Sequence, residues 1–251
     1  MLSRIPKRLG KEPLVDALFE VHFAPSEASL AASVPGFLMF AIPGIERTVQ
    51  SLPLGSVPKE FRDSQPGLSF QPLVRLEFGK YFINVGDRAL IVGAKLPYSG
   101  WSGFRSAILS VLDAVLGSGL VSSVVLCSIR YIDVVEQSII ASDISALDVG
   151  MRIAGKDITT ERTTITTRLQ DGRLVHDVMI NNSVDAQVAN RGAVKGIIIN
   201  TATIDEFEEE PAAKFKERLP QLADEIHASN KKVFFGLLTE ELVAKLDPIY
   251  E

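Results

Sequence analysis

The residues best suited to chemistry lie on two predicted strands, at 14–23 and 121–135. Arg130 stands between apolar neighbours in the second strand, where an unpaired guanidinium is costly to bury. Asp16 and Glu20 lie on the polar face of the first strand, so we expect one of them to pair with Arg130 if the strands are neighbours. The alternative is that Arg130 binds an anionic ligand, because a planar guanidinium suits carboxylate and phosphate. We favour the structural ion pair.

The three histidines are the other candidates for acid–base chemistry, because imidazole titrates near neutral pH. His22 lies on the first strand, His176 on a hairpin strand and His227 at a helix end. Their spacing is not that of metal ligands, such as two histidines four residues apart on a helix. A cluster of His22, Glu20 and Arg130 would form an acid–base centre, but an ordinary surface or edge position explains each histidine more simply.

Tyr131 and Asp133 follow Arg130 on the same strand and complete the set of ligand or ion-pair candidates. No glycine-rich phosphate loop opens a helix, and no nucleophile-elbow pattern occurs. The acidic run at 205–210 lacks the glycine of a calcium loop, and it precedes a helix whose dipole favours acids. The sequence therefore identifies no catalytic residue and predicts no metal and no cofactor.

Composition limits the class of protein. Of the 251 residues, 46% are hydrophobic, which is enough for a sizeable core. The net charge of −5 argues against a nucleic-acid partner, because phosphate contacts need a basic surface. Cys127, the single cysteine, lies in an apolar run and is expected to be a core residue. The sequence shows neither a signal peptide nor an apolar stretch long enough to cross a membrane, so we expect a cytoplasmic protein.

Hydrophobic periodicity places the elements that position these residues. Alternating or apolar runs predict strands at 14–23, 73–78, 81–85, 89–94, 121–135, 159–169, 174–180 and 196–204. Capping residues and apolar stripes predict helices at 26–32, 101–116, 211–229 and 239–247. Pro220 predicts a kink or a break in the third helix, and Asn230 is its expected C-cap.

The order of these elements predicts an α+β fold. Consecutive strands joined by hairpins indicate antiparallel pairing, and the lack of regular strand–helix alternation argues against a doubly wound parallel sheet. We expect one twisted antiparallel sheet with the two long helices packed on one face. The chain is expected to form a single domain, residues 1–251, whose halves at about 1–136 and 137–251 share the sheet.

Several short motifs occur in order along nearly the whole chain, at Pro13–Glu20, Tyr98–Trp101 with Phe104, Ile129–Asp133 and Phe234–Glu241. In these motifs the chain resembles a sporadically distributed bacterial family of uncharacterised proteins of about this length. That family usually has asparagine at the position of Asp133. The resemblance implies no activity, cofactor or fold.

These observations favour a non-enzymatic binding or regulatory protein that acts through protein–protein contacts, with a protein partner or a second copy of itself. Trp101, the single tryptophan, is either an interface anchor or a seal on the core where the helix begins. The alternative is a domain that binds a small anionic molecule, or an enzyme, with a cavity between the helices and the sheet.

Overall fold

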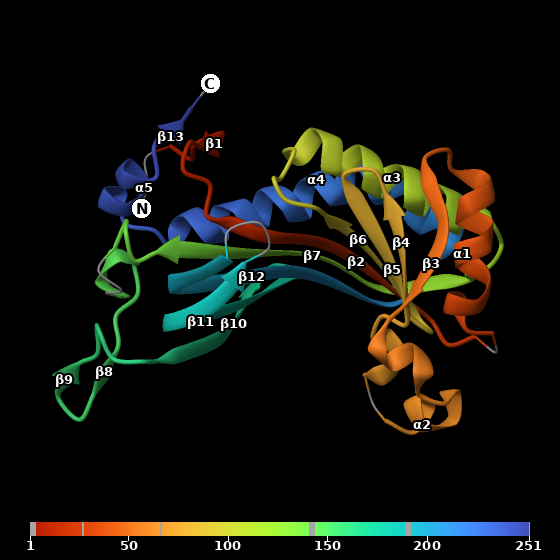
Figure 1. The fold of residues 1–251 in the computed structure, drawn as a ribbon, viewed down its shortest axis with the longest axis horizontal. Coiled ribbons are helices and arrows are strands. Elements are labelled where there is room, and N and C mark those ends of the chain that lie inside the picture. Colours follow the sequence, from red (N-terminus) through yellow and green to blue (C-terminus); the bar gives the residue numbers. More distant parts are fainter. Residues whose placement is uncertain (1–3, 27, 66, 141–143, 189–191, 251) are drawn as a thin grey trace. The chain divides into compact units, whose positions relative to one another are not determined.

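A computed structural model describes residues 4–26, 28–65, 67–140, 144–188 and 192–250. Within these residues the fold is mixed helix and sheet, with five α-helices and nine strands in one large antiparallel sheet (Figure 1). The predicted α+β class with an antiparallel sheet is therefore confirmed.

The bounds of the elements are as follows. The strands of the large sheet are β2 (Leu14–Phe23), β3 (Ile45–Ser51), β4 (Val74–Phe78), β5 (Tyr81–Val85), β6 (Ala89–Ala94), β7 (Ser123–Glu136), β10 (Thr164–Asp171), β11 (Leu174–Val188) and β12 (Gly192–Pro211). Two short ladders pair β1 (Arg8–Leu9) with β13 (Pro248–Ile249), and β8 (Arg152–Ile153) with β9 (Lys156–Asp157). The helices are α1 (Leu30–Ala41), α2 (Lys59–Ser64), α3 (Trp101–Gly117), α4 (Ala212–Gly236) and α5 (Glu240–Lys245), with 3₁₀ turns η1 (Pro53–Ser56), η2 (Leu68–Phe70) and η3 (Ile144–Ala146).

The chain divides into two compact units. Unit 1 consists of Met1–Asp16, Arg130–Thr203 and His227–Glu251, and unit 2 of Ala17–Ile129 and Ile204–Ile226. Strands β2, β7 and β12 and helix α4 each contribute residues to both units.

Unit 2 is built on a meander of short antiparallel strands. β2 pairs with β6, β6 with β5, β5 with β4 and β4 with β3. The β4–β5 turn is tight because Gly79 adopts a φ of 56°, which favours glycine. The predicted apolar stripe of α3 is buried at Phe104, Ile108, Val111, Leu112 and Val115. These strands and α3 thus follow directly from the periodicity of the sequence.

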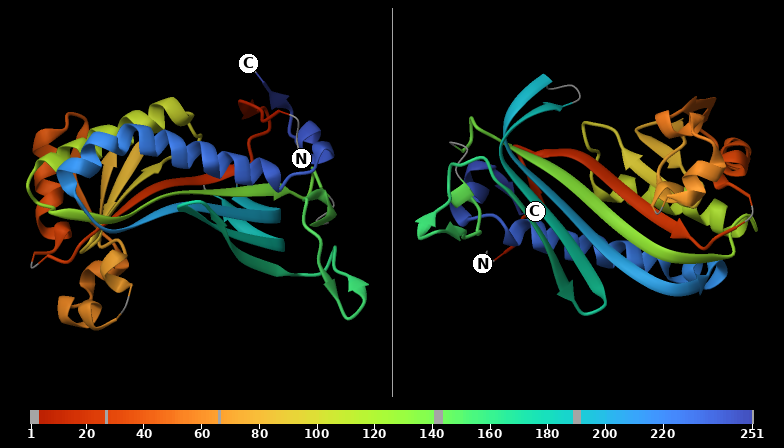
Figure 2. Two further views of the ribbon diagram at one scale, coloured as in Figure 1. Left: turned by 180° about the vertical axis from the view of Figure 1, so that it is seen from behind. Right: turned by 90° about the horizontal axis from the view of Figure 1, so that it is seen from below.

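Helix α3 and the part of α4 in unit 2 lie side by side (Figure 2). Lys216 Nζ lies 2.9 Å from Asp113 Oδ1, and Arg105 Nε donates to Asp224 Oδ1 at 2.8 Å. Arg105 also donates to the carbonyl of Pro220 at 3.1 Å. The predicted break at Pro220 is wrong, because α4 is one helix from Ala212 to Gly236. Buried Leu219 and Leu222 on either side of the proline offset the hydrogen bond that it removes.

Unit 1 has its own apolar core. Its members come from the strands, from the end of α4, from α5 and from the turns and loops beside them, and they are Leu9, Val135, Ile140, Ile144, Leu147, Val178, Ile180, Ile197, Ile199, Phe234, Phe235, Leu238, Leu242, Val243 and Leu246. β10 and β11 form a hairpin that turns at Gly172, between two of the predicted strands. Thr239 caps α5 by accepting a hydrogen bond from the backbone of Leu242, which confirms the predicted last helix.

Two predicted helix ends are wrong. Helix α1 covers Leu30–Ala41 instead of 26–32, and Ser26 donates its hydroxyl to the carbonyl of Ala28 instead of capping the helix. The N–H of Leu30 donates to the carbonyl of Asp87, so a tertiary contact sets the start of the helix. Asn230 is not a C-cap, because α4 continues past it and its buried side chain bonds to β12.

Candidate functional site

The chain leaves the sheet between β3 and β4 and forms the α2 segment, described at residues 52–65 and 67–70. Pro53 begins the turn η1, Pro58 is the N-cap of α2, and Gly67 adopts a φ of 86° before η2. Proline fixes its own φ and glycine accepts a positive φ, so these residues divide the segment into short turns. Such turns make few backbone bonds to the sheet, and side-chain contacts must hold the segment in place.

Arg62 on α2 and Asp87 in the β5–β6 turn form the main anchor of the α2 segment. Arg62 Nε and Nη2 donate to the two carboxylate oxygens of Asp87 at 2.7 and 2.9 Å, and the side chains are 8% and 3% exposed. Burial by itself raises the pKa of Asp87, but hydrogen bonds from Arg62 and Ser29 outweigh it and lower that pKa below its ordinary value. Removing either partner leaves the other charge buried and unpaired, so the pair fixes the position of α2.

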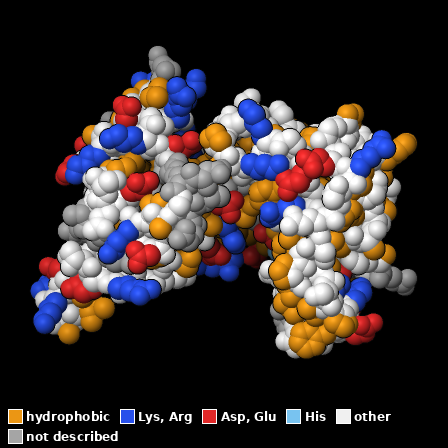
Figure 3. Space-filling model, viewed as in Figure 1, with side chains coloured by type: hydrophobic (Ala, Val, Ile, Leu, Met, Phe, Trp, Pro, Cys, Tyr) orange, Lys and Arg blue, Asp and Glu red, His pale blue; other side chains and the backbone are white. Residues whose placement is uncertain are grey.

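The α2 segment carries apolar side chains that are exposed or half-buried. Phe61, the neighbour of Arg62, is 56% exposed, and Leu54, Val57 and Leu68 are half-buried. We call these four residues the apolar platform. Figure 3 shows hydrophobic side chains gathered over this part of the molecule. Exposed aromatic side chains that stand on a fixed support are typical anchors of protein interfaces.

His22 and Glu20 secure the other end of the α2 segment. The two side chains meet on β2, with His22 Nε2 2.5 Å from Glu20 Oε1. The His22 ring stacks on Phe70 with centroids 4.1 Å apart, and the guanidinium of Arg88 lies 4.7 Å from the same phenyl ring. These two candidates therefore come together, and their contact holds Phe70 against the sheet.

A polar hollow of about 230 Å³ lies beside α2. Its lining includes two cations, Lys59 and Arg88, and two carboxylates, Asp63 and Asp87. Lys59 pairs with Asp63 at 2.6 Å, and Asp87 pairs with Arg62. The two cations of the lining balance its two carboxylates, so the lining has no net charge to attract an ionic ligand.

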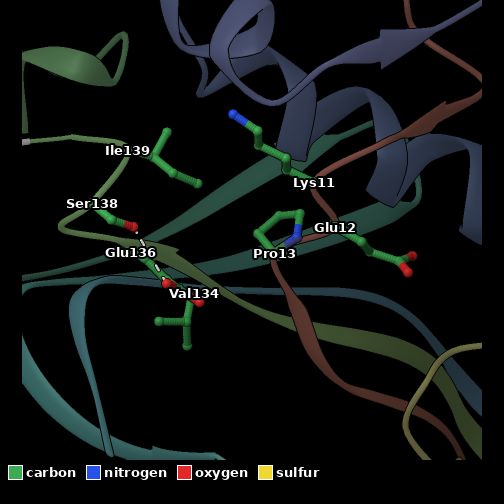
Figure 4. Close-up of a pocket in the computed structure, with 7 residues that line it drawn as sticks. All are labelled: Lys11, Glu12, Pro13, Val134, Glu136, Ser138 and Ile139. Atoms are coloured by element: carbon green, nitrogen blue, oxygen red, sulfur yellow. Dashed lines mark hydrogen bonds between the residues drawn. The ribbon is translucent and has the colours of Figure 1, made fainter. Parts of the chain in front are cut away.

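A second cavity, of about 470 Å³, lies in unit 1 (Figure 4). Its lining comes from the segment before β2 and from the end of β7 with the turn that follows: Lys11, Glu12, Pro13, Val134, Glu136, Ser138 and Ile139. The lining contains one ammonium group, of Lys11, and two carboxylates, of Glu12 and Glu136, so its net charge is negative. This balance disfavours the anionic ligand that the sequence left open.

Asp133 lies next to Val134 on β7 but is only 5% exposed. Burial raises the pKa of Asp133 to about 8, and the nearby charge of Glu12 adds to the effect. The carboxyl is therefore mainly protonated at neutral pH, a state in which a side chain can exchange protons with a substrate. Among the described residues, however, Asp133 does not line the cavity. Asp133 is therefore a buried, mainly protonated carboxyl group that does not line this cavity.

Other polar side chains of unit 1 join β7, β11 and β12 to the end of α4. The Tyr131 hydroxyl lies 2.9 Å from His227 Nδ1. A ligand candidate and an acid–base candidate from the sequence are therefore in contact. His176 is buried, with Nδ1 2.9 Å from the Thr203 hydroxyl, and burial lowers the pKa of His176. The amide of Asn230 donates to the carbonyl of Thr201 at 3.1 Å. Paired in this way, these groups position α4 on the strands.

The remaining sequence candidates lie elsewhere. Arg130 is exposed on β7, and Asp16 is half-buried on β2. An exposed guanidinium stays hydrated, so the burial argument that required a carboxylate partner for Arg130 does not apply. Trp101 is half-buried, and its Nε1 donates to Asp224 at 2.9 Å. Trp101 thereby links α3 to α4, and its role as an interface residue stays a prediction.

Sequence reasoning missed the residues that build the α2 segment. Phe61 and Arg62 lie in a proline-divided stretch without periodicity, and Asp87 lies in a short connection between two predicted strands. The sequence features that could have indicated these residues were a phenylalanine next to an arginine, and an aspartate in a turn between two apolar strands. These features identify no pair until the fold brings α2 to the turn.

Neither a protein-family model nor a curated protein matches this sequence significantly. In the part of the chain that the structure describes, no three histidine, cysteine or carboxylate side chains are grouped to hold a metal ion. The described helices include none with the length and apolar character needed to cross a membrane.

Proposed function

We propose that this protein is a non-enzymatic binding protein that recognises a protein partner through the apolar platform of the α2 segment. The observation that carries the proposal is the contrast between two neighbours: Phe61 is 56% exposed, while the Arg62 side chain is 8% exposed and paired with Asp87. The anchor is thus held before binding, which reduces the conformational entropy lost when a partner docks. The partner would offer an apolar pocket that accepts a phenyl ring.

In this proposal the sheet and the long helices are a scaffold. We propose that α3 and α4 cover one face of the sheet. Each helix has buried apolar residues, and β5 and β6 carry the turn that contains Asp87. A rigid scaffold that presents a short irregular segment is a common arrangement in binding proteins. We also propose a cytoplasmic location, for which the single cysteine, buried and without a disulfide partner, is the support.

The alternative function, binding of a small anionic molecule or catalysis upon it, has less support. Arg130, its proposed anchor, is exposed and lies outside the lining of the 470 Å³ cavity of unit 1. That cavity presents Glu12 and Glu136 against Lys11. An anion entering it would meet net negative charge.

Site-specific photo-crosslinking in the native cell tests the proposed function. A photoreactive phenylalanine analogue replaces Phe61 in one variant and Phe40 in the control. Phe40 is 92% exposed on α1 and also belongs to unit 2, so it controls for random collisions. We expect a discrete covalent adduct with one protein from position 61 and none of that size from position 40.

The adduct identified from position 61 then supplies the purified partner for a binding assay. Phe61→Glu should weaken that binding by on the order of 30-fold or more, as expected when a central aromatic anchor is lost, whereas Phe40→Glu should leave it unchanged. Both variants must keep the circular dichroism and melting temperature of the wild type. Adducts that are the same at both positions, or binding that survives Phe61→Glu, would overturn the proposal.

A further inference from the structure

The strand β10 ends the large sheet on the side of unit 1. It pairs with β11 without interruption over its eight residues, from Thr164 opposite Asn181 to Asp171 opposite Leu174. Every residue of β10 is exposed except Ile165, which is half-buried. The strand contains neither proline nor lysine nor a bulge, three features that protect a sheet edge from pairing, and its only charged residues are Arg168 and Asp171.

The hydrogen bonds of the hairpin show which backbone groups of β10 face outward. The N–H of Asn182 donates to the carbonyl of Thr163 at 2.9 Å, which makes these two residues a hydrogen-bonded pair. In an antiparallel ladder the direction of the backbone groups alternates, so those of residues 165, 167 and 169 point toward β11. The N–H and C=O groups of residues 164, 166, 168 and 170 therefore lie along the free edge.

From this edge we infer that the protein forms a homodimer by antiparallel pairing of β10 with β10 of a second copy, about a two-fold axis at Thr167. This inference goes beyond the proposed function and does not depend on it, because the ligand is the chain itself. A two-fold axis perpendicular to the sheet places the same face of both copies on the same side. A residue of one copy therefore lies opposite a residue of the second copy whose side chain points to the same face, so the two residue numbers add to an even sum.

Centring the axis at Thr167 places Ile165 of one copy opposite Leu169 of the other. Ile165 and Leu169 lie on the same face of the sheet as Ile180 and His176, their buried partners on β11. Leu169 is 45% exposed in the single chain and would be covered by the second copy. The dimer therefore closes an apolar seam along the core face of the sheet.

The same register is compatible with the charges and the backbone. Arg168 lies opposite Thr166 of the second copy, whereas an axis at Arg168 would place two guanidinium groups opposite each other. The outward residues form the pairs 164–170 and 166–168, twice each by symmetry. The four outward residues of each copy then supply up to about eight interchain hydrogen bonds.

Engineered cysteines test both the contact and its register. Opposite residues in a pair without backbone hydrogen bonds have Cα atoms about 4.5 Å apart, within the range that a disulfide spans. Thr167→Cys should therefore form a covalent dimer under mild oxidation. Thr166→Cys is the matched control, because its copies are offset by two residues and lie roughly 8 Å apart. The wild type controls for Cys127, which is buried.

Sedimentation tests the dimer without any crosslink. The wild type should sediment as a dimer, and Thr166→Pro should raise its dissociation constant by on the order of tenfold or more, because proline removes an outward N–H and blocks the edge. Thr166→Ala keeps the N–H and should remain dimeric. Leu169→Lys leaves the backbone unchanged and should also give monomers. This variant tests the inference even if the proline variant does not fold.

Several results would overturn the inference. They are a wild type that stays monomeric at high micromolar concentration, equal crosslinking at positions 166 and 167, or a ladder of higher oligomers in place of a dimer. Phe61→Glu should leave the dimer intact, and Leu169→Lys should leave partner crosslinking at position 61 intact. Failure of this inference is therefore distinguishable from failure of the proposed function.

Discussion

Replacing Asp133 with asparagine is expected to stabilise the protein at neutral pH. The asparagine keeps the shape of the side chain but cannot ionise. In the unfolded chain the carboxyl has its ordinary pKa of 3.8, whereas burial raises the pKa to about 8 in the folded protein. Between these values the unfolded chain releases a proton that the folded protein retains, so stability falls as pH rises.

The size of the effect follows from the two pKa values. Each unit of pKa difference corresponds to about 1.4 kcal/mol, and pH 7 lies 3.2 units above the ordinary value of 3.8. Asp133→Asn should therefore raise the free energy of unfolding at pH 7 by up to about 4 kcal/mol. For a chain of this length such a change raises the melting temperature by on the order of 10 °C.

Urea unfolding at pH 5 and pH 7 separates this effect from any change in packing. A packing change shifts both measurements equally, whereas loss of the titration makes the variant's advantage over wild type grow by about 3 kcal/mol between the two pH values. Asp148→Asn is the control, because Asp148 is exposed. An advantage of Asp133→Asn that is the same at pH 5 and pH 7 would refute the reasoning.

Three further predictions concern other charged or titrating groups. Arg62→Ala should cost about 3–5 kcal/mol in urea unfolding because it leaves Asp87 buried without its partner, and simple additivity with Asp87→Asn would contradict the pairing. His176 has a lowered pKa, so its contribution to stability is present above the ordinary value of 6.5 and is lost as pH falls below it. The free energy of unfolding of His176→Asn, measured relative to wild type, should therefore rise between pH 7 and pH 5, and a difference that is the same at both pH values would exclude this contribution. Arg130→Ala should cost under about 1 kcal/mol in thermal melts because the side chain is exposed, and a loss of 3 kcal/mol would reveal a buried role.

The sequence predicted the elements whose signal is local. The alternation of β2 gave its observed bounds, Leu14–Phe23, and its inward side chains are buried. Alternating or apolar runs placed the short strands of unit 2, and the apolar stripe placed α3. In each case neighbouring residues contain the whole pattern, because a strand or helix exposes its faces at a fixed period.

Elements that depend on distant contacts were predicted less well. Helix α1 begins where Leu30 bonds to Asp87, and α4 continues past Asn230 because that side chain bonds to Thr201 on β12. Strand β12 extends from Gly192 to Pro211, well beyond its apolar centre. Hydrogen bonds to a neighbouring strand can extend a strand through polar residues, and sequence periodicity does not contain that neighbour.

The sequence by itself determined the α+β class, the antiparallel hairpins and the burial of the cysteine. It also determined that the candidates Asp16, Glu20 and Arg130 lie on strands. Only the tertiary structure decided which polar residues are buried and with what partner. Asp133 and Arg130 are three residues apart on β7, yet the first is 5% exposed and the second is exposed. Arg62 is buried while Phe61 beside it is open. The physical reason is that the cost of burying a charge depends on whether a partner or water surrounds it, and the folded chain alone supplies those surroundings.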